Sequence, residues 1–291
     1  MLSNIASRRP HWCAVLIGLA VTLLATGQPS ARTAAPSYEV YAVQFASAPY
    51  AVRNLVAGVT DRTRMIDIAF TVWVVRGGGR TVLVDAGFYR DKFIQQWKPR
   101  DFMKPSEALQ AKLKIAPDEV TDIIVTHSHW DHVDGADLFP KATIHIQKEE
   151  MSYYVGADGA VLHTGGVDAD DAKMLASLSG AGRVHQIDGD AQDVLPGIRV
   201  YTGGKHTFAS QYVGVDTAKG VIVLASDNAY LYENLEQHLA IAQTLDAASN
   251  LAAQTRMLSL AAAKTLVVPG HDPAVFQRFP QPGNGVARID R

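Results

Sequence analysis

The feature that most constrains this chain is a run of metal-binding side chains at residues 127–132, which reads His-Ser-His-Trp-Asp-His. The run directly follows a short apolar stretch, Ile123 to Val125, that is typical of a strand buried on both faces. Side chains at a strand exit can converge on a small volume, because alternate residues of an extended backbone point the same way. Neutral imidazoles with a carboxylate suit zinc, and also iron, manganese or cobalt. The sequence therefore predicts a metal site at the end of this strand.

Three further predicted strands each end in one side chain of the same ligand type. A metal site needs more ligands than one loop supplies, and active sites commonly form where strands end. We therefore expect these side chains to join the 127–132 run. They are His206 after the strand at 198–201, Asp227 after 221–225 and His271 after 266–268.

The apolar periodicity of the rest of the chain indicates a layered α/β domain. Strands come first in runs and then alternate with helices, which favours sheet packed on sheet with helices outside. We expect one domain over residues 36–291, with a polar tail rich in Pro and Gly at 280–291. Strands are predicted over residues 66–75, 81–84, 123–125, 142–146, 198–201, 212–215, 221–225 and 266–268, and helices over 106–115 and 244–263.

With these residues in these places, the sequence resembles the metallo-β-lactamase superfamily of metallohydrolases over nearly all of residues 36–291. The resemblance implies a four-layer αββα sandwich, the metallo-β-lactamase fold, with a site for two divalent metal ions between the sheets. Zinc is the expected metal, with iron, manganese or cobalt as alternatives. Carried over position by position, His127, His129 and His206 would hold the first metal, Asp131, His132 and His271 the second, and Asp227 would bridge the two.

Two further positions bear on this resemblance. Asp85 lies in a DxG turn, and the resemblance implies that it supports the ligand loop. After the last histidine of the run the superfamily has a small residue and two glycines, whereas this chain has Val133, Asp134 and Gly135. We expect this departure to alter the turn and not the ligands, and Asp134 to face solvent.

The clue to the substrate is Tyr230, three residues after Asp227. A metal-bridging hydroxide can attack lactones, β-lactams, thioesters and phosphodiesters alike, so the metals alone do not decide. The spacing of Asp227 and Tyr230 resembles the N-acyl-homoserine lactonase branch, where this Tyr reaches the lactone oxygen. The resemblance implies a quorum-quenching type of lactone hydrolysis, with Tyr230 as a transition-state donor and Asp131 as the proton shuttle. Packing of Tyr230 in the core is the alternative.

Other activities of the same superfamily stay open. Exported metallo-β-lactamases lack the bridging carboxylate, so Asp227 counts against them. Glyoxalase-type thioesterases need a basic C-terminal region, and the last stretch of the chain has only Arg278, Arg288 and Arg291. A phosphodiesterase would want a cation near the site, where Lys205 is the sole candidate. A metal-binding or scaffolding protein without catalysis is the remaining class.

Two segments are candidates for shaping a substrate site. Residues 92–103 are rich in aromatic side chains and could line an acyl groove, and the loop-like stretch 151–171 could cap the metals. Core packing of the first segment and a plain surface insertion at the second are the alternatives.

The N-terminus has the layout of a secretory signal peptide. Arg8 and Arg9 precede an uncharged, mostly apolar run from Ala14 to Thr26, and small residues follow. The run is shorter than the roughly 20 residues that a transmembrane helix needs. We expect residues 1–35 to be a signal peptide cleaved somewhere in 27–35, which makes the mature protein periplasmic or secreted, without stable membrane association. An uncleaved anchor is the alternative.

Composition narrows the chemistry and the partners. The one cysteine, Cys13, lies in the predicted signal peptide, so the mature chain has no disulfide, cysteine nucleophile or thiolate ligand. Residues 36–291 carry 24 basic and 29 acidic side chains without a basic cluster, which argues against nucleic acid as a partner. A small-molecule substrate is the expected partner, and a homodimer is compatible with the sequence.

Overall fold

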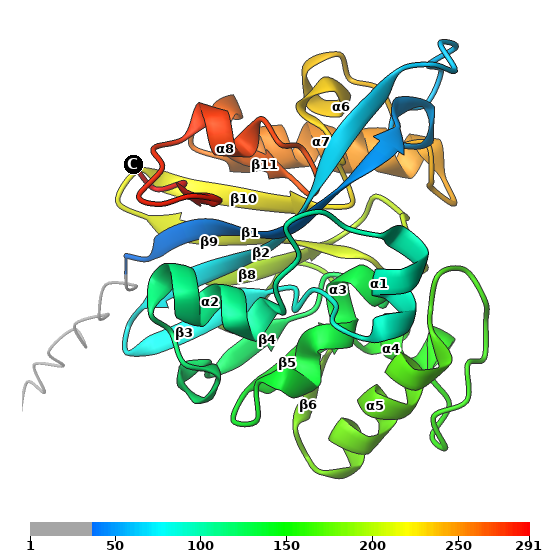
Figure 1. Ribbon diagram of the computed structural model, residues 1–291, viewed down its shortest axis with the longest axis vertical. Coiled ribbons are helices and arrows are strands. Elements are labelled where there is room, and N and C mark those ends of the chain that lie inside the picture. Colours follow the sequence, from blue (N-terminus) through cyan, green and yellow to red (C-terminus); the bar gives the residue numbers. More distant parts are fainter. Residues whose placement is uncertain (1–36) are drawn as a thin grey trace, which may run out of the picture. The chain divides into compact units, whose positions relative to one another are not determined.

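The computed structural model describes residues 37–291, so the predicted signal peptide and Cys13 lie outside the described residues. Residues 37–291 form two β-sheets packed face to face, with helices on both outer faces (Figure 1). The four-layer αββα sandwich expected from the sequence is confirmed. Within this part of the chain, no helix is both long enough and apolar enough to cross a membrane.

The first sheet has seven strands in the order β12-β1-β2-β3-β4-β5-β6. Strands β12, β1, β2 and β3 pair antiparallel, whereas β3 to β6 run parallel. Parallel neighbours end at the same edge of the sheet, so the residues that follow β3 and β4 lie close together. The strands are β1 (Glu39–Ala51), β2 (Met65–Gly77), β3 (Arg80–Val84), β4 (Asp122–Ile124), β5 (Thr143–Gln147), β6 (Val184–Ile187) and β12 (Val286–Arg288).

The second sheet has five strands in the order β11-β10-β9-β8-β7. A hairpin turn around Lys219 and Gly220 joins β9 to β10, and β11 lies parallel to β10 on its other side. The strands are β7 (Gln192–Leu195), β8 (Ile198–Thr202), β9 (Gln211–Thr217), β10 (Gly220–Ser226) and β11 (Val267–Pro269).

Helices α1 to α5 belong to the first sheet's side of the sandwich, and α6 to α8 to the second sheet's side (Figure 1). The longest, α7, begins later than predicted because the Asp246 carboxylate caps it, accepting from the N–H groups of Ala248 and Ser249. The helices are α1 (Asp91–Trp97), α2 (Pro105–Leu113), α3 (Trp130–Val133), α4 (Lys148–Tyr154), α5 (Ala169–Gly180), α6 (Tyr232–Glu236), α7 (Ala247–Leu260) and α8 (Val275–Arg278).

Side chains of the central strands alternate between two cores, as the two-residue period of a strand requires. On β2, Val72 and Val74 pack in the core beneath the helices of the first sheet. Their neighbours Trp73 and Val75 pack with side chains of the second sheet. A strand buried on both faces is mostly apolar, which explains the apolar run at residues 123–125 in and directly after β4.

The prediction of a polar tail at residues 280–291 is wrong in part, because these residues include a strand. Val286 and Ala287 of β12 pair with β1 at the edge of the first sheet, and Ile289 is fully buried. The Pro and Gly residues that precede this strand hid a short apolar run. The loop-like stretch expected at 151–171 is likewise shorter, since α4 ends at Tyr154 and α5 begins at Ala169.

Asp134 is fully buried, and the prediction that it faces solvent is wrong. Its carboxylate accepts the N–H groups of Tyr89 and Arg90 and pairs with the Arg90 guanidinium. The same guanidinium bonds Asp171 Oδ1 on α5 at 2.6 Å. Two buried carboxylates thus share one cation, and burial together with the Asp134 charge raises the pKa of Asp171 to about 9.

We expect this cluster to make stability depend on pH. Folded Asp171 keeps its proton, whereas the unfolded chain ionises it near its usual pKa, so unfolding releases a proton between about pH 4 and pH 9. The free energy of unfolding should therefore fall as the pH rises through this window. Asp171→Asn removes the ionisation and should flatten the fall.

Urea unfolding at about pH 5 and pH 8 measures the effect, with the exposed neighbour Asp170→Asn as the matched control. The control should keep the wild-type difference between the two pH values. An Asp171→Asn variant with that same difference would show that Asp171 is ionised in the folded protein.

Candidate metal centre

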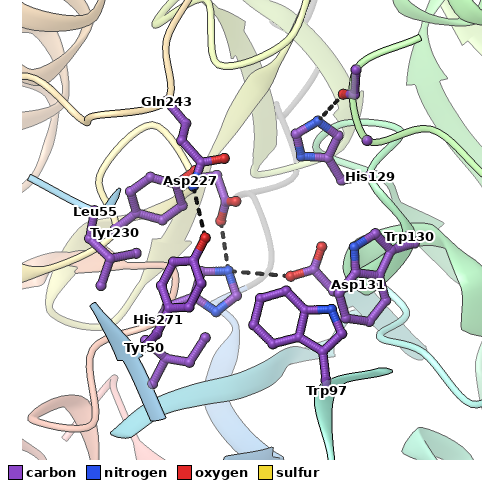
Figure 2. Close-up of a pocket in the computed structure, with 13 residues that line it drawn as sticks. Tyr50, Leu55, Trp97, His129, Trp130, Asp131, Asp227, Tyr230, Gln243 and His271 are labelled. Carbon is purple, nitrogen blue, oxygen red and sulfur yellow. Dashed lines mark hydrogen bonds and ion pairs between the residues drawn. The ribbon is translucent and has the colours of Figure 1, made fainter. Parts of the chain in front are cut away.

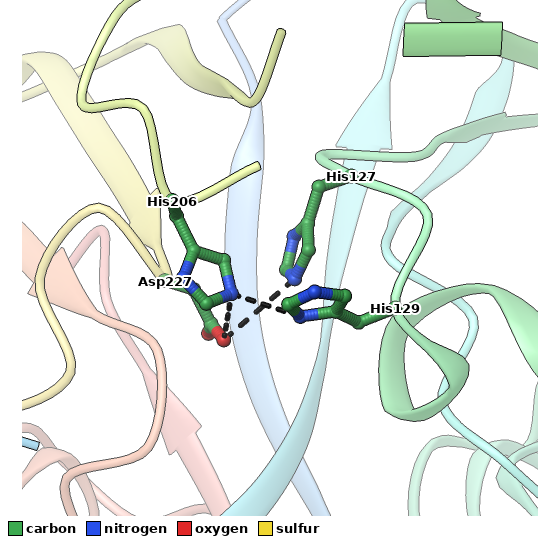
Figure 3. A group of neighbouring side chains, drawn as sticks. All are labelled: His127, His129, His206 and Asp227. Atoms are coloured by element: carbon green, nitrogen blue, oxygen red, sulfur yellow. Dashed lines mark hydrogen bonds and ion pairs between the residues drawn. The ribbon is translucent and has the colours of Figure 1, made fainter. Parts of the chain in front are cut away.

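Strand ends of both sheets meet at one edge of the sandwich and bring seven ligand-type side chains together. β4 leads into the loop and helix α3 that carry the 127–132 run, and β8, β10 and β11 lead to His206, Asp227 and His271. Among the described residues, ligand atoms lie within 4.8 Å of one another in two groups. The first group is His127, His129, His206 and Asp227 (Figure 3), and the second group is Asp131, His132 and His271.

The Asp227 carboxylate lies between the two groups. Its Oδ2 is 3.2 Å from His206 Nε2 and 3.7 Å from His127 Nε2 in the first group. Its Oδ1 is 3.0 Å from His271 Nε2 and 3.3 Å from His132 Nε2 in the second. One oxygen faces each group, which is the arrangement of a carboxylate that can bridge two metal ions.

All five imidazoles are fixed by a hydrogen bond at the nitrogen that points away from the centre. A proton on the outer nitrogen leaves the lone pair on the inner one, which is the state that binds a metal. In the first group, the partner of His127 is Thr126 Oγ1 at 3.0 Å, that of His129 is the Gly165 carbonyl at 2.8 Å, and that of His206 is the Gln243 carbonyl at 2.7 Å. In the second group, the partner of His132 is Asp85 Oδ2 at 2.8 Å, and that of His271 is the Ala69 carbonyl at 3.0 Å.

Asp85 supports the ligand loop as the sequence implied. It is fully buried at the end of β3, and besides His132 its carboxylate accepts the N–H and hydroxyl of Thr126 and the hydroxyl of Ser226. One carboxylate therefore joins the ends of β3, β4 and β10. These bonds hold the two sheets in register at the edge where the ligands converge.

The donor set fits metal ions because it leaves buried polar atoms without partners. His127 Nε2, His132 Nε2 and Asp227 Oδ1 have no hydrogen bond partner among the described residues. His129 Nδ1 and His206 Nε2 lie 2.9 Å apart with their lone pairs turned to the same point. Such unpaired atoms are costly in a buried site, and a cation at each group would satisfy them.

The charges around the imidazoles differ between the groups. Burial and the neighbouring imidazoles hold the pKa of His127 well below its usual range and lower the pKa of His129 to about 3. Burial also opposes protonation of His132 and His271, but the Asp227 and Asp131 carboxylates outweigh it and raise the pKa of both. Neutral nitrogens in the first group and anionic oxygens beside the second are both ligands for divalent metals such as zinc.

A cavity of about 190 Å³ opens beside the centre (Figure 2). Asp131, Asp227, His129 and His271 form its polar part. None of the described residues that line it is Lys or Arg. The rest of the lining is mostly apolar or aromatic and consists of Tyr50, Leu55, Ile68, Trp97, Trp130, Gly165, Gly166, Tyr230 and Gln243.

Tyr230 packs in the core, as its alternative interpretation expected, and it also lines the cavity. The hydroxyl is 3.3 Å from His206 Nδ1, whose proton already goes to the Gln243 carbonyl. Burial and the Asp227 charge raise the pKa of Tyr230 well above its usual value. The phenol therefore stays protonated at neutral pH and can donate a hydrogen bond into the cavity.

Two other residues from the sequence analysis have defined places. Of the aromatic segment 92–103, Trp97 of α1 lines the cavity, whereas Phe93 and Phe102 pack in or against the first core, as the alternative expected. Lys205 does not line it, because its ammonium donates to the Phe208 carbonyl at 2.7 Å and lies 4.8 Å from the centre of the Phe208 ring.

Glu150 of α4 is a supporting residue that sequence reasoning missed. It is fully buried, and its Oε1 accepts the N–H and hydroxyl of Ser128 at 3.0 and 2.6 Å. Its Oε2 accepts the N–H of Ala209 at 2.8 Å. One carboxylate thus joins the loop of His127 and His129 to the loop of His206. In the sequence Glu150 is one of two adjacent glutamates at the start of a helix, and nothing there indicates that it connects two loops.

We expect Glu150→Gln to loosen the first group. The amide nitrogen would face a backbone N–H of Ser128 or Ala209, and a buried donor without an acceptor costs about 1–3 kcal/mol. Urea unfolding and elemental analysis should show lower stability and less than the two metals per chain expected of the wild type. Glu149→Gln, at the exposed neighbour, is the control and should change neither. Two metals and wild-type stability in Glu150→Gln would contradict the supporting role.

Comparisons with known proteins agree with this geometry. Residues 71–271 match the sequence model of the metallo-beta-lactamase superfamily. A comparison with curated protein sequences finds no significant match.

Similar solved structures at low sequence identity include lactonases. A quorum-quenching N-acyl homoserine lactone lactonase has a TM-score of 0.65 and 19% identity over 81% of this chain and 92% of that chain. B. thuringiensis AiiA with N-decanoyl-L-homoserine bound has a TM-score of 0.67 and 18% identity over 83% and 96% of the chains. AidC, a dizinc quorum-quenching lactonase, has a TM-score of 0.62 and 14% identity over 87% and 94%. At these identities the likeness concerns the fold.

Proposed function

The chain belongs to the metallo-beta-lactamase superfamily of metallohydrolases, and on that premise we propose that it opens N-acyl-homoserine lactones. The membership confirms the resemblance seen in the sequence. We propose further that the seven side chains of the two groups hold two divalent metals, with zinc as the first choice. The similar structures, which include lactonases and complexes with N-acyl-L-homoserines, support this substrate class.

The observation that carries the proposal is the cavity lining, which joins ligand side chains to an apolar wall without a cation. An N-acyl-homoserine lactone is uncharged and has an apolar tail, so it needs no ammonium or guanidinium partner. β-Lactam antibiotics, glutathione thioesters and phosphodiesters are anions, and their recognition would be helped by Lys or Arg. Tyr50, Leu55 and Trp97 offer the acyl chain apolar surface instead.

We assign separate roles in the proposed reaction to Asp131 and Tyr230. Hydrolysis adds a water oxygen to the lactone carbonyl carbon, breaks the ring C–O bond and moves one proton from the water to the released ring oxygen. Two divalent metals, when bound, lower the pKa of water and polarise a carbonyl oxygen. Asp131, which lines the cavity, is placed to hold the proton between its two positions. Tyr230 donates to the substrate oxygen that gains negative charge, a bond that strengthens in the transition state.

We expect Tyr230→Phe to lower kcat on N-acyl-homoserine lactones by about tenfold to a hundredfold without changing the metal content. Loss of one oxyanion donor typically costs on the order of 2.7–4 kcal/mol, and metal ions would carry part of that charge here. Tyr232→Phe is the matched control, because its buried hydroxyl has no hydrogen bond partner and lies outside the cavity lining.

Steady-state kinetics on a panel of a lactone, a cephalosporin, a thioester and a phosphodiester test the substrate class. Full kcat and KM in Tyr230→Phe would make Tyr230 a packing residue only. Faster opening of the cephalosporin or thioester by the wild type would replace the lactonase proposal with the corresponding branch.

We also propose that the protein acts after export, as the N-terminal pattern predicts. Expression of the full chain should yield a periplasmic or secreted protein whose N-terminus lies within residues 28–36. N-terminal sequencing of the soluble product reads the cleavage site directly. Recovery of Met1 in the soluble fraction would refute cleavage.

A further inference from the structure

The segment between α4 and α5, residues 155–168, reaches the metal centre through two glycines. The Gly165 carbonyl lies 2.8 Å from His129 Nε2 and accepts its proton (Figure 2). A Cβ atom on Gly166 would lie 2.6 Å from His129 Cδ2, so the backbone there passes directly against the imidazole edge. Gly166 also has a φ of +94°, which side chains rarely adopt. The segment therefore fixes which nitrogen of His129 faces the first group.

A stack of three rings holds this segment in place. Tyr153 of α4 lies between His163 and Phe208, with centroid distances of 3.9 and 4.0 Å and interplanar angles of 13° and 1°. His163 is in the segment, two residues before Gly165, and its ring is exposed on the outer side of the stack. Besides the stack, the segment is held by Val161 and Val167, which pack against the first core, and by the Leu162 N–H, which donates to the Tyr154 carbonyl. Of these contacts, only the stack involves a side chain close to Gly165 in the chain and a side chain on the loop of His206.

The other end of the stack is tied to a second ligand of the same group. Phe208 follows His206 by two residues, and its N–H donates to the Tyr154 hydroxyl at 3.3 Å. The stack thus connects the segment that supports His129 to the loop that carries His206, and the inner nitrogens of these two side chains are 2.9 Å apart. The second group has different supports, since His132 and His271 bond Asp85 and the Ala69 carbonyl.

We propose that the His163–Tyr153–Phe208 stack is a positioning device for the first metal site. It holds the Gly165 carbonyl on His129 and thereby keeps His129 Nδ1 and His206 Nε2 aimed at one point. None of the three rings is a ligand, so they act through the side chains that they hold. The inference rests on the two-metal part of the proposed function and not on the lactone as substrate.

The test compares His163→Ala, which removes the ring, with His163→Phe, which removes the imidazole but keeps a ring for the stack. The readout is the release of zinc from the fully loaded protein to a coloured chelator, followed in time, with elemental analysis at the end. Loss of an outer support of a metal ligand typically weakens metal binding by about 10–100-fold. We expect one of the two metals to leave about tenfold faster or more in His163→Ala, and both to leave at wild-type rates in His163→Phe.

Gly166→Ala provides a second, independent change, because its Cβ would press on the His129 ring. It should speed the release of one metal as His163→Ala does. Retention of the slowly released metal, together with wild-type far-UV circular dichroism, shows that each variant is folded. Equal release rates in the wild type, His163→Ala and Gly166→Ala would overturn the proposal.

The outcomes separate this inference from the proposed activity. A wild-type protein that holds two metals and releases them as expected, but opens no lactone, leaves the positioning role intact and removes the lactonase proposal. A wild-type protein that binds fewer than two metals removes both. Faster release of both metals in His163→Ala would show general loosening and would overturn the selective role of the stack.

Discussion

The contact on which the rest of the structure depends is the Asp227 carboxylate between two groups of buried imidazoles. Its oxygens lie 3.0 to 3.7 Å from four histidine nitrogens that come from three different segments. The Asp227 charge attracts the imidazoles of the second group and raises the pKa of His132 and His271, whereas the imidazoles of the first group oppose protonation of one another. The sandwich and the hydrogen bonds around the centre hold both groups in place.

These outer bonds follow the topology of the two sheets. Asp85 at the end of β3 holds β4, β10 and His132, while Glu150 on α4 joins the loops of His127 and His206. Both carboxylates are fully buried and are compensated by several donors each, which is the condition under which a buried charge is tolerated. The ligands belong to strand ends, but their aim is set by carboxylates and carbonyls that bind no metal.

Features that depend on residues close together in the sequence were predicted, and features that depend on partners far apart in the sequence were missed. The convergence of the seven ligand-type side chains was predictable because they follow short predicted strands, and the fold class because the strand and helix periods are local. Asp134 was misjudged because its partner, Arg90, lies 44 positions away, and Glu150 because it bonds Ser128 and Ala209 at 22 and 59 positions. Strand β12 was missed for the same reason, since its three residues, Val286 to Arg288, form a strand only beside β1. Long-range pairing leaves no periodic pattern to detect.

Gln243 contacts both the wall of the cavity and one histidine of the candidate metal centre. Its backbone carbonyl accepts the outer proton of His206, while its side-chain amide donates to the Tyr50 hydroxyl at 3.3 Å and to the Asn54 carbonyl at 3.1 Å. Tyr50 in turn packs on Trp97 with a centroid distance of 5.4 Å. A ligand that pushes Tyr50 and Trp97 apart therefore acts on the same residue that aims His206. In the proposed lactonase, binding of the acyl group and the geometry of the first group are therefore coupled through the segment of Gln243, which lies far from the histidine run in the sequence.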